Sequence, residues 1–180
     1  MSTIPPLPYE TPATDEDLTA MREQLGRPIR GVHSIARRCA CGRPAVVRTA
    51  PRLEDGTPFP TSLYLTLPAL VAAMSRLEAS GRMAELTDRL GEDPELAAAY
   101  AAAHRRYLAR RAELGEAEEI ADVSAGGMPT RVKCLHSLAG HALAEGTGLN
   151  PIGDLVLAEV EQTASLSTCR CEEQEAEISS

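Results

Sequence analysis

The sequence predicts a single α+β domain, in which a small three-stranded antiparallel sheet is packed on one face by about five or six helices. Its 180 residues suffice for one hydrophobic core. Only 3% of the residues are aromatic, whereas alanine and leucine are abundant, which favours an aliphatic core built on helices. Short β-branched runs lie within residues 31–67, and a helical spacing of apolar residues begins at Pro68.

The two ends of the chain are expected to lie outside this domain. Residues 1–14 are rich in proline and are predicted to be a disordered tail, since proline cannot propagate a helix. Residues 163–180 are polar and are predicted to be a flexible tail that carries a C-x-C pair. The globular domain is therefore predicted to span residues 15–162.

The first half of the domain is predicted to contain one helix and then the sheet. Thr14 or Asp15 can cap a helix whose apolar face ends before Gly26. Strands are predicted at residues 31–38, 45–50 and 62–67. The first two strands form a hairpin, and the sequence CACGRP, residues 39–44, occupies its turn.

The second half is predicted to be helical. The predicted helices begin after Leu67, after Gly81, at Pro94, at Pro129 and at Pro151. Asp93 and Asn150 precede two of these prolines and are the predicted N-caps. The helix that begins at Pro129 is predicted to reach Glu145.

Charge and hydropathy exclude two classes of partner. The formal net charge is −8 and the basic residues are dispersed, so we expect no binding to nucleic acid. No run approaches the roughly 20 apolar residues that span a bilayer, so we expect no membrane insertion. The proline-rich, acidic start lacks the features of a signal peptide, and we expect a cytoplasmic protein.

The cysteines are the main candidates for a metal site. Cys39 and Cys41 form a C-x-C pair at the predicted hairpin turn, which supplies half of a tetrahedral thiolate site. Cys134, Cys169 and Cys171 are the candidates that complete it, with zinc as the expected ion. An iron–sulfur cluster is the alternative cofactor. The competing interpretation is that these cysteines only pack beside a turn or lie idle in the tail.

The segment KCLHSLAGH resembles a helical metal motif, but helix geometry argues against one. On a regular helix Cys134 and His136 point about 200° apart, and Cys134 and His141 lie roughly 10 Å apart along the axis. Neither pair can then chelate one ion. Cys134 can still donate a single ligand to a site built by the hairpin, and His136 is a candidate general acid or base.

A second hypothesis concerns anions. Gly126 and Gly127 precede a predicted helix, and Arg131 and Lys133 follow, so free amides and positive charge can hold a phosphate there. This segment, together with His136, favours the alternative that the protein is an enzyme or sensor for a phosphorylated small molecule. A glycine pair is equally a simple way for the chain to enter a helix. We find no catalytic motif, so whether the protein is an enzyme stays open.

Three blocks carry a resemblance to a known family. They are DGTPFPT (residues 55–61), RVKCLH (residues 131–136) and NPIGD (residues 150–154). Over about residues 26–158 the chain resembles the bacterial, mainly actinobacterial, family catalogued as domain of unknown function 501. The resemblance implies no activity. It implies a link to cell division or polyphosphate physiology, because members are encoded near septum-formation and exopolyphosphatase genes. It also implies a cysteine where this chain has Leu67.

Together these observations predict a non-catalytic zinc-binding protein that acts through an unknown protein partner. Cys39, Cys41 and Cys134 are expected to hold the ion, with Cys169 or Cys171 completing the set. The alternative is the phosphate-binding enzyme or sensor described above.

Overall fold

The computed structural model describes residues 4–168 and Cys171, and within them it shows an α+β fold with six α-helices and one antiparallel sheet. The strands are β1 (Thr11–Pro12), β2 (Val32–Arg38), β3 (Pro44–Thr49) and β4 (Leu63–Leu65). The helices are α1 (Asp15–Leu25), α2 (Pro68–Ala79), α3 (Arg82–Glu92), α4 (Pro94–Ala112), α5 (Leu135–Glu145) and α6 (Pro151–Val160). No helix in this part of the chain is both long and apolar enough to cross a membrane.

The sheet has four strands in the order β1-β2-β3-β4, so the prediction of three strands is wrong. The additional strand, β1, lies in the segment that was predicted to be a disordered tail, and Thr11 pairs with Ile35 of β2. A two-residue strand that contains a proline has no periodicity for sequence analysis to detect. Long-range contacts hold it in place, because Glu10 accepts hydrogen bonds from Ser34 and from Arg48.

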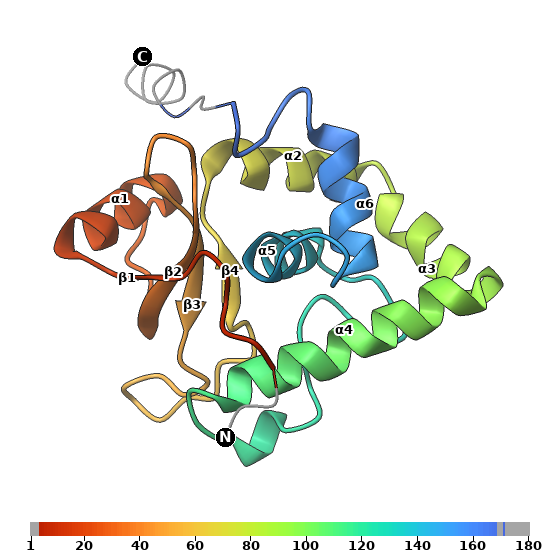
Figure 1. The fold of residues 1–180 in the computed structure, drawn as a ribbon, viewed down its shortest axis with the longest axis horizontal. Coiled ribbons are helices and arrows are strands. Elements are labelled where there is room, and N and C mark those ends of the chain that lie inside the picture. Colours follow the sequence, from red (N-terminus) through yellow and green to blue (C-terminus); the bar gives the residue numbers. More distant parts are fainter. Residues whose placement is uncertain (1–3, 169–170, 172–180) are drawn as a thin grey trace.

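Helices cover both faces of the sheet, which corrects the expectation that they lie on one face. On one face Val46 and Leu65 join the main core, which the helices α2 to α6 build (Figure 1). On the other face Ile35 and Val47 pack against Met21 of α1. Because both faces are covered, all six residues of β3 are buried.

Helix α5 is the centre of the molecule, enclosed by β4, α2 and α6 (Figure 1). Two glycines allow this close packing. A β-carbon at Gly140 would lie 2.9 Å from the carbonyl oxygen of Leu63 in β4, and one at Gly153 of α6 would lie 2.3 Å from that of Leu138. Any side chain at either position would therefore push α5 away from its neighbours.

Helix α5 begins at Leu135, six residues later than predicted for the helix that starts at Pro129. The preceding residues form an irregular loop. In this loop the amide of Arg131 donates to the carbonyl of Gly127 at 3.0 Å, and that of Lys133 to the carbonyl of Gly126 at 2.7 Å. Both glycines have positive φ, so the loop satisfies its amides through turns that a regular helix does not contain.

A buried ion-pair network anchors the other end of α5. Glu145 is 4% exposed and accepts hydrogen bonds from Arg110 of α4, at 2.8 and 3.0 Å, and from Arg106, at 2.7 Å. Burial raises the pKa of Glu145, but the hydrogen bonds from Arg110 and Arg106 outweigh it, and the pKa is lowered overall. The carboxylate is therefore held in its charged form inside the core.

Candidate metal centre

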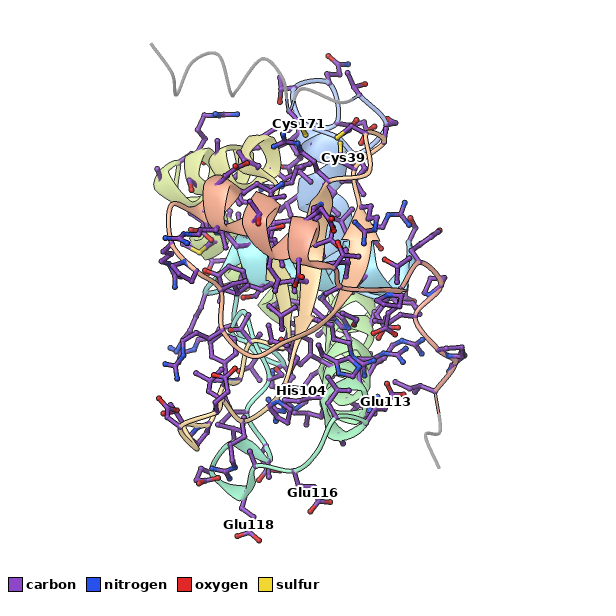
Figure 2. The ribbon with its side chains drawn as sticks, turned by 90° about the vertical axis from the view of Figure 1, so that its left-hand side faces the viewer. Cys39, His104, Glu113, Glu116, Glu118 and Cys171 are labelled. Carbon is purple, nitrogen blue, oxygen red and sulfur yellow. The ribbon has the colours of Figure 1, made fainter. Side chains whose placement is uncertain are left out.

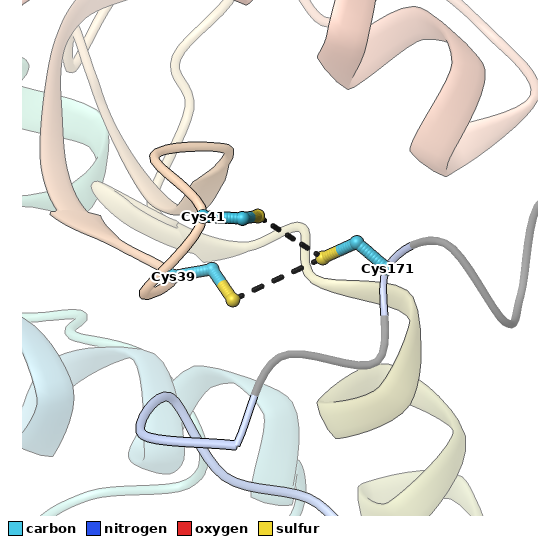
Figure 3. A group of neighbouring side chains, drawn as sticks. All are labelled: Cys39, Cys41 and Cys171. Carbon is cyan, nitrogen blue, oxygen red and sulfur yellow. Dashed lines mark hydrogen bonds between the residues drawn. The ribbon is translucent and has the colours of Figure 1, made fainter.

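The turn between β2 and β3 carries Cys39 and Cys41. The amide of Cys39 donates to the carbonyl of Arg43, and the amide of Gly42 donates to the carbonyl of Cys39, both at 2.9 Å. Gly42 has a φ of 91°, which glycine adopts without strain. This tight turn directs both cysteine side chains to the same side, toward the C-terminal segment (Figure 3).

The C-terminal segment meets this turn directly. The amide of Ala40 donates to the carbonyl of Leu166 at 3.0 Å, so the backbone after α6 is hydrogen-bonded to the tip of the hairpin. Ala164 and Cys171 are 3% and 6% exposed, although both fall in the stretch that was predicted to be a flexible tail. Cys39 and Cys171 consequently lie together at one end of the molecule, far from His104 (Figure 2).

Three sulfur atoms converge at this end, and we call Cys39, Cys41 and Cys171 the thiol centre (Figure 3). The Sγ atoms of Cys41 and Cys171 are 3.6 Å apart, and those of Cys171 and Cys39 are 3.9 Å apart. Tetrahedral coordination with zinc–sulfur bonds of about 2.3 Å places neighbouring sulfurs about 3.8 Å apart. Two of the three sulfur pairs therefore already have the spacing of ligands on one tetrahedral ion, and the third pair, Cys39 and Cys41, lies within 4.8 Å.

The donor set favours a soft metal. Thiolates select zinc, copper(I) and iron–sulfur centres, whereas magnesium and calcium require oxygen ligands. Cys39 and Cys171 are buried and Cys41 is exposed, so the site is enclosed on one side by the protein. Cys169, which was predicted as a further ligand, lies outside the described residues.

The structure separates Cys134 from the thiol centre and places it with Glu78 and His136 in a second set, which we call the Cys134 group. The argument from regular helix geometry does not apply to Cys134 and His136. Cys134 is the N-cap of α5 and has extended backbone angles, φ −151° and ψ 107°, so it does not follow the helical 100° step. Glu78 was missed because it lies on α2, 58 residues from His136, with no local signal.

The Cys134 group has perturbed acid–base properties. The hydrogen bond to Cys134 and, to a smaller extent, the contact with Glu78 together raise the pKa of His136 to about 9 against the opposing effect of burial. Burial raises the pKa of Cys134, but hydrogen bonds to His136 and Ser137 outweigh that effect and lower it overall. The thiolate form of Cys134 and the imidazolium form of His136 thus stabilise each other.

The residues predicted to bind an anion lie in the loop before α5. The side chains of Arg131 and Lys133 are exposed, and their amides are hydrogen-bonded to Gly127 and Gly126, as described above. At the start of α5 the amide of Leu135 donates to the carboxylate of Glu78 at 2.7 Å. This amide is therefore occupied by an anionic group of the protein itself. Phosphate binding by this segment stays a prediction.

Comparison with known protein families gives a match. A family model described as "Protein of unknown function (DUF501)" matches residues 35–158. The matched range contains the whole Cys134 group and both cysteines of the hairpin turn, but not Cys171. No curated protein and no solved structure matches the chain.

Proposed function

The chain belongs to the family described as "Protein of unknown function (DUF501)", a description that supplies no activity. From the geometry we propose that the protein binds zinc and that its thiol centre is a structural zinc site. The single observation that carries this proposal is the convergence of three sulfurs from two distant segments. Cys41 and Cys171 are 130 residues apart in the sequence, yet their Sγ atoms are separated by 3.6 Å. One ion then fastens the C-terminal segment to the hairpin.

Zinc is favoured over the alternative of an iron–sulfur cluster. In a cubane cluster each cysteine ligates a different iron, which spreads the sulfurs over the corners of the cluster. The sulfurs of the thiol centre instead stand 3.6 and 3.9 Å apart, which suits ligands that share one ion. A closed zinc–thiolate site also has no redox chemistry, which agrees with a structural role.

The proposed role is non-catalytic. A structural zinc site is filled by four protein ligands and leaves no position for a substrate, and Cys169 is the sequence's candidate for the fourth. We therefore infer that the protein acts in the cytoplasm through contacts with a protein partner. The reduced thiols that such a site requires persist in that compartment.

Elemental analysis of untagged protein, purified without oxygen, tests this proposal. We expect zinc at the thiol centre, no visible absorption, and the loss of one equivalent of zinc per chain in the Cys39→Ser/Cys41→Ser variant. Replacement of His33 by alanine is the matched control, because it removes an exposed side chain able to bind metal that lies outside both the thiol centre and the Cys134 group. The proposal fails if the double variant keeps the zinc content of the unaltered protein.

A further inference from the structure

The Cys134 group brings three kinds of metal ligand together where α2 meets α5. Glu78 lies near the end of α2, Cys134 caps α5, and His136 lies in the first turn of α5. One ligand atom from each, a carboxylate oxygen, a thiol sulfur and a ring nitrogen, lies within 4.8 Å of the other two. This is the donor set, mixed sulfur, nitrogen and oxygen, from which protein zinc sites are made.

The imidazole of His136 is oriented as a metal ligand. Its Nε2 atom is 3.1 Å from the carbonyl oxygen of Val71 and 3.2 Å from the hydroxyl of Ser75. A carbonyl accepts and never donates, so Nε2 carries a proton. The other nitrogen, Nδ1, faces the carboxylate of Glu78 at 3.0 Å and becomes free to bind an ion when it gives up its own proton. Metal-binding histidines usually donate their second nitrogen to a carbonyl or carboxylate in this way.

The other two ligands are also held from outside the group. The Oε1 atom of Glu78 accepts the amide of Leu135 at 2.7 Å, and the Sγ atom of Cys134 accepts the hydroxyl of Ser137 at 3.5 Å. Adjacent nitrogen and oxygen ligands of one tetrahedral zinc stand about 3.4 Å apart, so the contact between Glu78 and His136 needs to open only slightly. The ligands are thus close to the coordinating arrangement before an ion binds.

A cavity of about 350 Å³ borders two of the three ligands, Cys134 and His136. Its other walls come from β4 and from Leu25, Thr61, Val71 and Ser137. The side chains of His136 and Glu78 are 25% and 23% exposed, so water reaches the group. Zinc sites that exchange or activate a bound ligand have three protein ligands, and their fourth coordination position opens onto a cavity.

The same residues do not fit a cysteine–histidine nucleophile. In such a pair the base presents one ring nitrogen to the nucleophile while an orienting group binds the other. Here Glu78 engages Nδ1, and Val71 with Ser75 engages Nε2, so His136 has no ring nitrogen dedicated to Cys134.

We propose that Glu78, Cys134 and His136 form a second zinc site, separate from the thiol centre and open on one side, where water or a small oxygen ligand completes the coordination. The thiol centre has the ligands of a closed site, and this group has those of an accessible one. A divalent transition metal with tetrahedral preference is its ligand class.

Titration of the Cys39→Ser/Cys41→Ser protein with cobalt(II), which substitutes for zinc and reports thiolate ligation by charge-transfer absorption, tests this proposal without the thiol centre. We expect one equivalent to bind with that absorption. A further Cys134→Ser exchange, which preserves side-chain size, should abolish the absorption and weaken binding more than about tenfold. Glu78→Gln should weaken binding while keeping the absorption, and His33→Ala, at an exposed histidine, should change neither.

The outcomes separate this proposal from the structural role of the thiol centre. If cobalt does not bind to the double variant, or binds equally after Cys134→Ser, the second site does not exist. If the double variant keeps all of its zinc and Cys134→Ser removes it, the second site stands and the thiol centre fails. Circular dichroism of each metal-free variant shows whether the fold is retained, so that loss of binding is assigned to the ligand.

Discussion

The two thiol-bearing sites differ in what holds their ligands together. The thiol centre joins a hairpin turn to Cys171, and the contacts between these segments include the hydrogen bond from Ala40 to Leu166 and the approach of the sulfurs. The Cys134 group lies at the start of the most enclosed helix, and an outer contact fixes each ligand. We expect an ion to strengthen the first site more, because its ligands come from a turn and from the C-terminal segment, whereas the ligands of the second site are held by α2 and the start of α5. Changes to the core around α5 should affect only the second site.

The largest expected effect is at the buried end of α5. Replacing Glu145 by alanine removes the fully buried one of the two carboxylates that bind Arg110, the other being that of Glu113, and should lower the free energy of unfolding by about 3 kcal/mol. Thermal unfolding of metal-free protein measures this change. The matched control is Glu119→Ala at the exposed pair with Arg52, which should leave stability unchanged. Equal effects of both changes would contradict the view that the α5 region carries the stability.

The next effect concerns acid. His141 of α5 is fully buried, and burial lowers its pKa from 6.5 to about 4, with Arg106 and Arg110 of α4 lowering it and Glu145 partly opposing. In the unfolded chain His141 becomes protonated below about pH 6.5, whereas in the folded protein it becomes protonated only below about pH 4. The free energy of unfolding should therefore fall as the pH drops through this window, by on the order of 3 kcal/mol.

Urea unfolding at several pH values between 7 and 4 measures the slope. His141→Gln, which does not titrate, should flatten the dependence that His141 contributes, while acidic groups such as Glu145 keep theirs. An unchanged slope in the variant would show that His141 is not the group that resists protonation. The thiol centre contributes equally to the slope of both proteins, since the variant leaves its three cysteines intact.

A smaller effect is expected at the contact between α5 and β4. Gly140→Ala places a methyl group 2.9 Å from the carbonyl oxygen of Leu63 and should cost about 1–3 kcal/mol of stability. The shift of α5 should also weaken cobalt binding at the Cys134 group but not at the thiol centre. Gly91→Ala, where a β-carbon meets no atom within 4 Å, is the control. Weaker binding at the thiol centre in the Gly140 variant would break the proposed independence of the two sites.

The same contrast explains how much the sequence could predict. Features set by neighbouring residues were confirmed: the caps Thr14, Asp93 and Asn150 all accept the expected amide hydrogen bonds, and the C-x-C pair lies at the turn between β2 and β3. The family resemblance was also confirmed.

Features set by tertiary packing were not predicted. The strand β1 depends on pairing with β2, and the start of α5 depends on glycine turns that look like a helix entry in the sequence. Glu78 carries no local pattern and joins the Cys134 group only because α2 packs on α5. Zinc binding, the cytoplasmic location and a protein partner stay predictions.

The smallest expected effect is local and distinguishes the two sites most directly. Removal of metal by a chelator should free the C-terminal segment from the hairpin while the core stays folded, because that core of aliphatic side chains is complete without the ion. The Ala40 amide, which donates to Leu166, should then exchange its hydrogen faster. The Cys39 amide, which donates to Arg43 within the turn, should keep its protection.

Hydrogen exchange of the Cys134→Ser protein, with and without chelator, isolates the thiol centre. If the Ala40 amide exchanges at the same rate with and without chelator, packing alone holds the C-terminal segment on the hairpin. The ligands of the thiol centre would then be assembled without metal, as we infer for those of the Cys134 group.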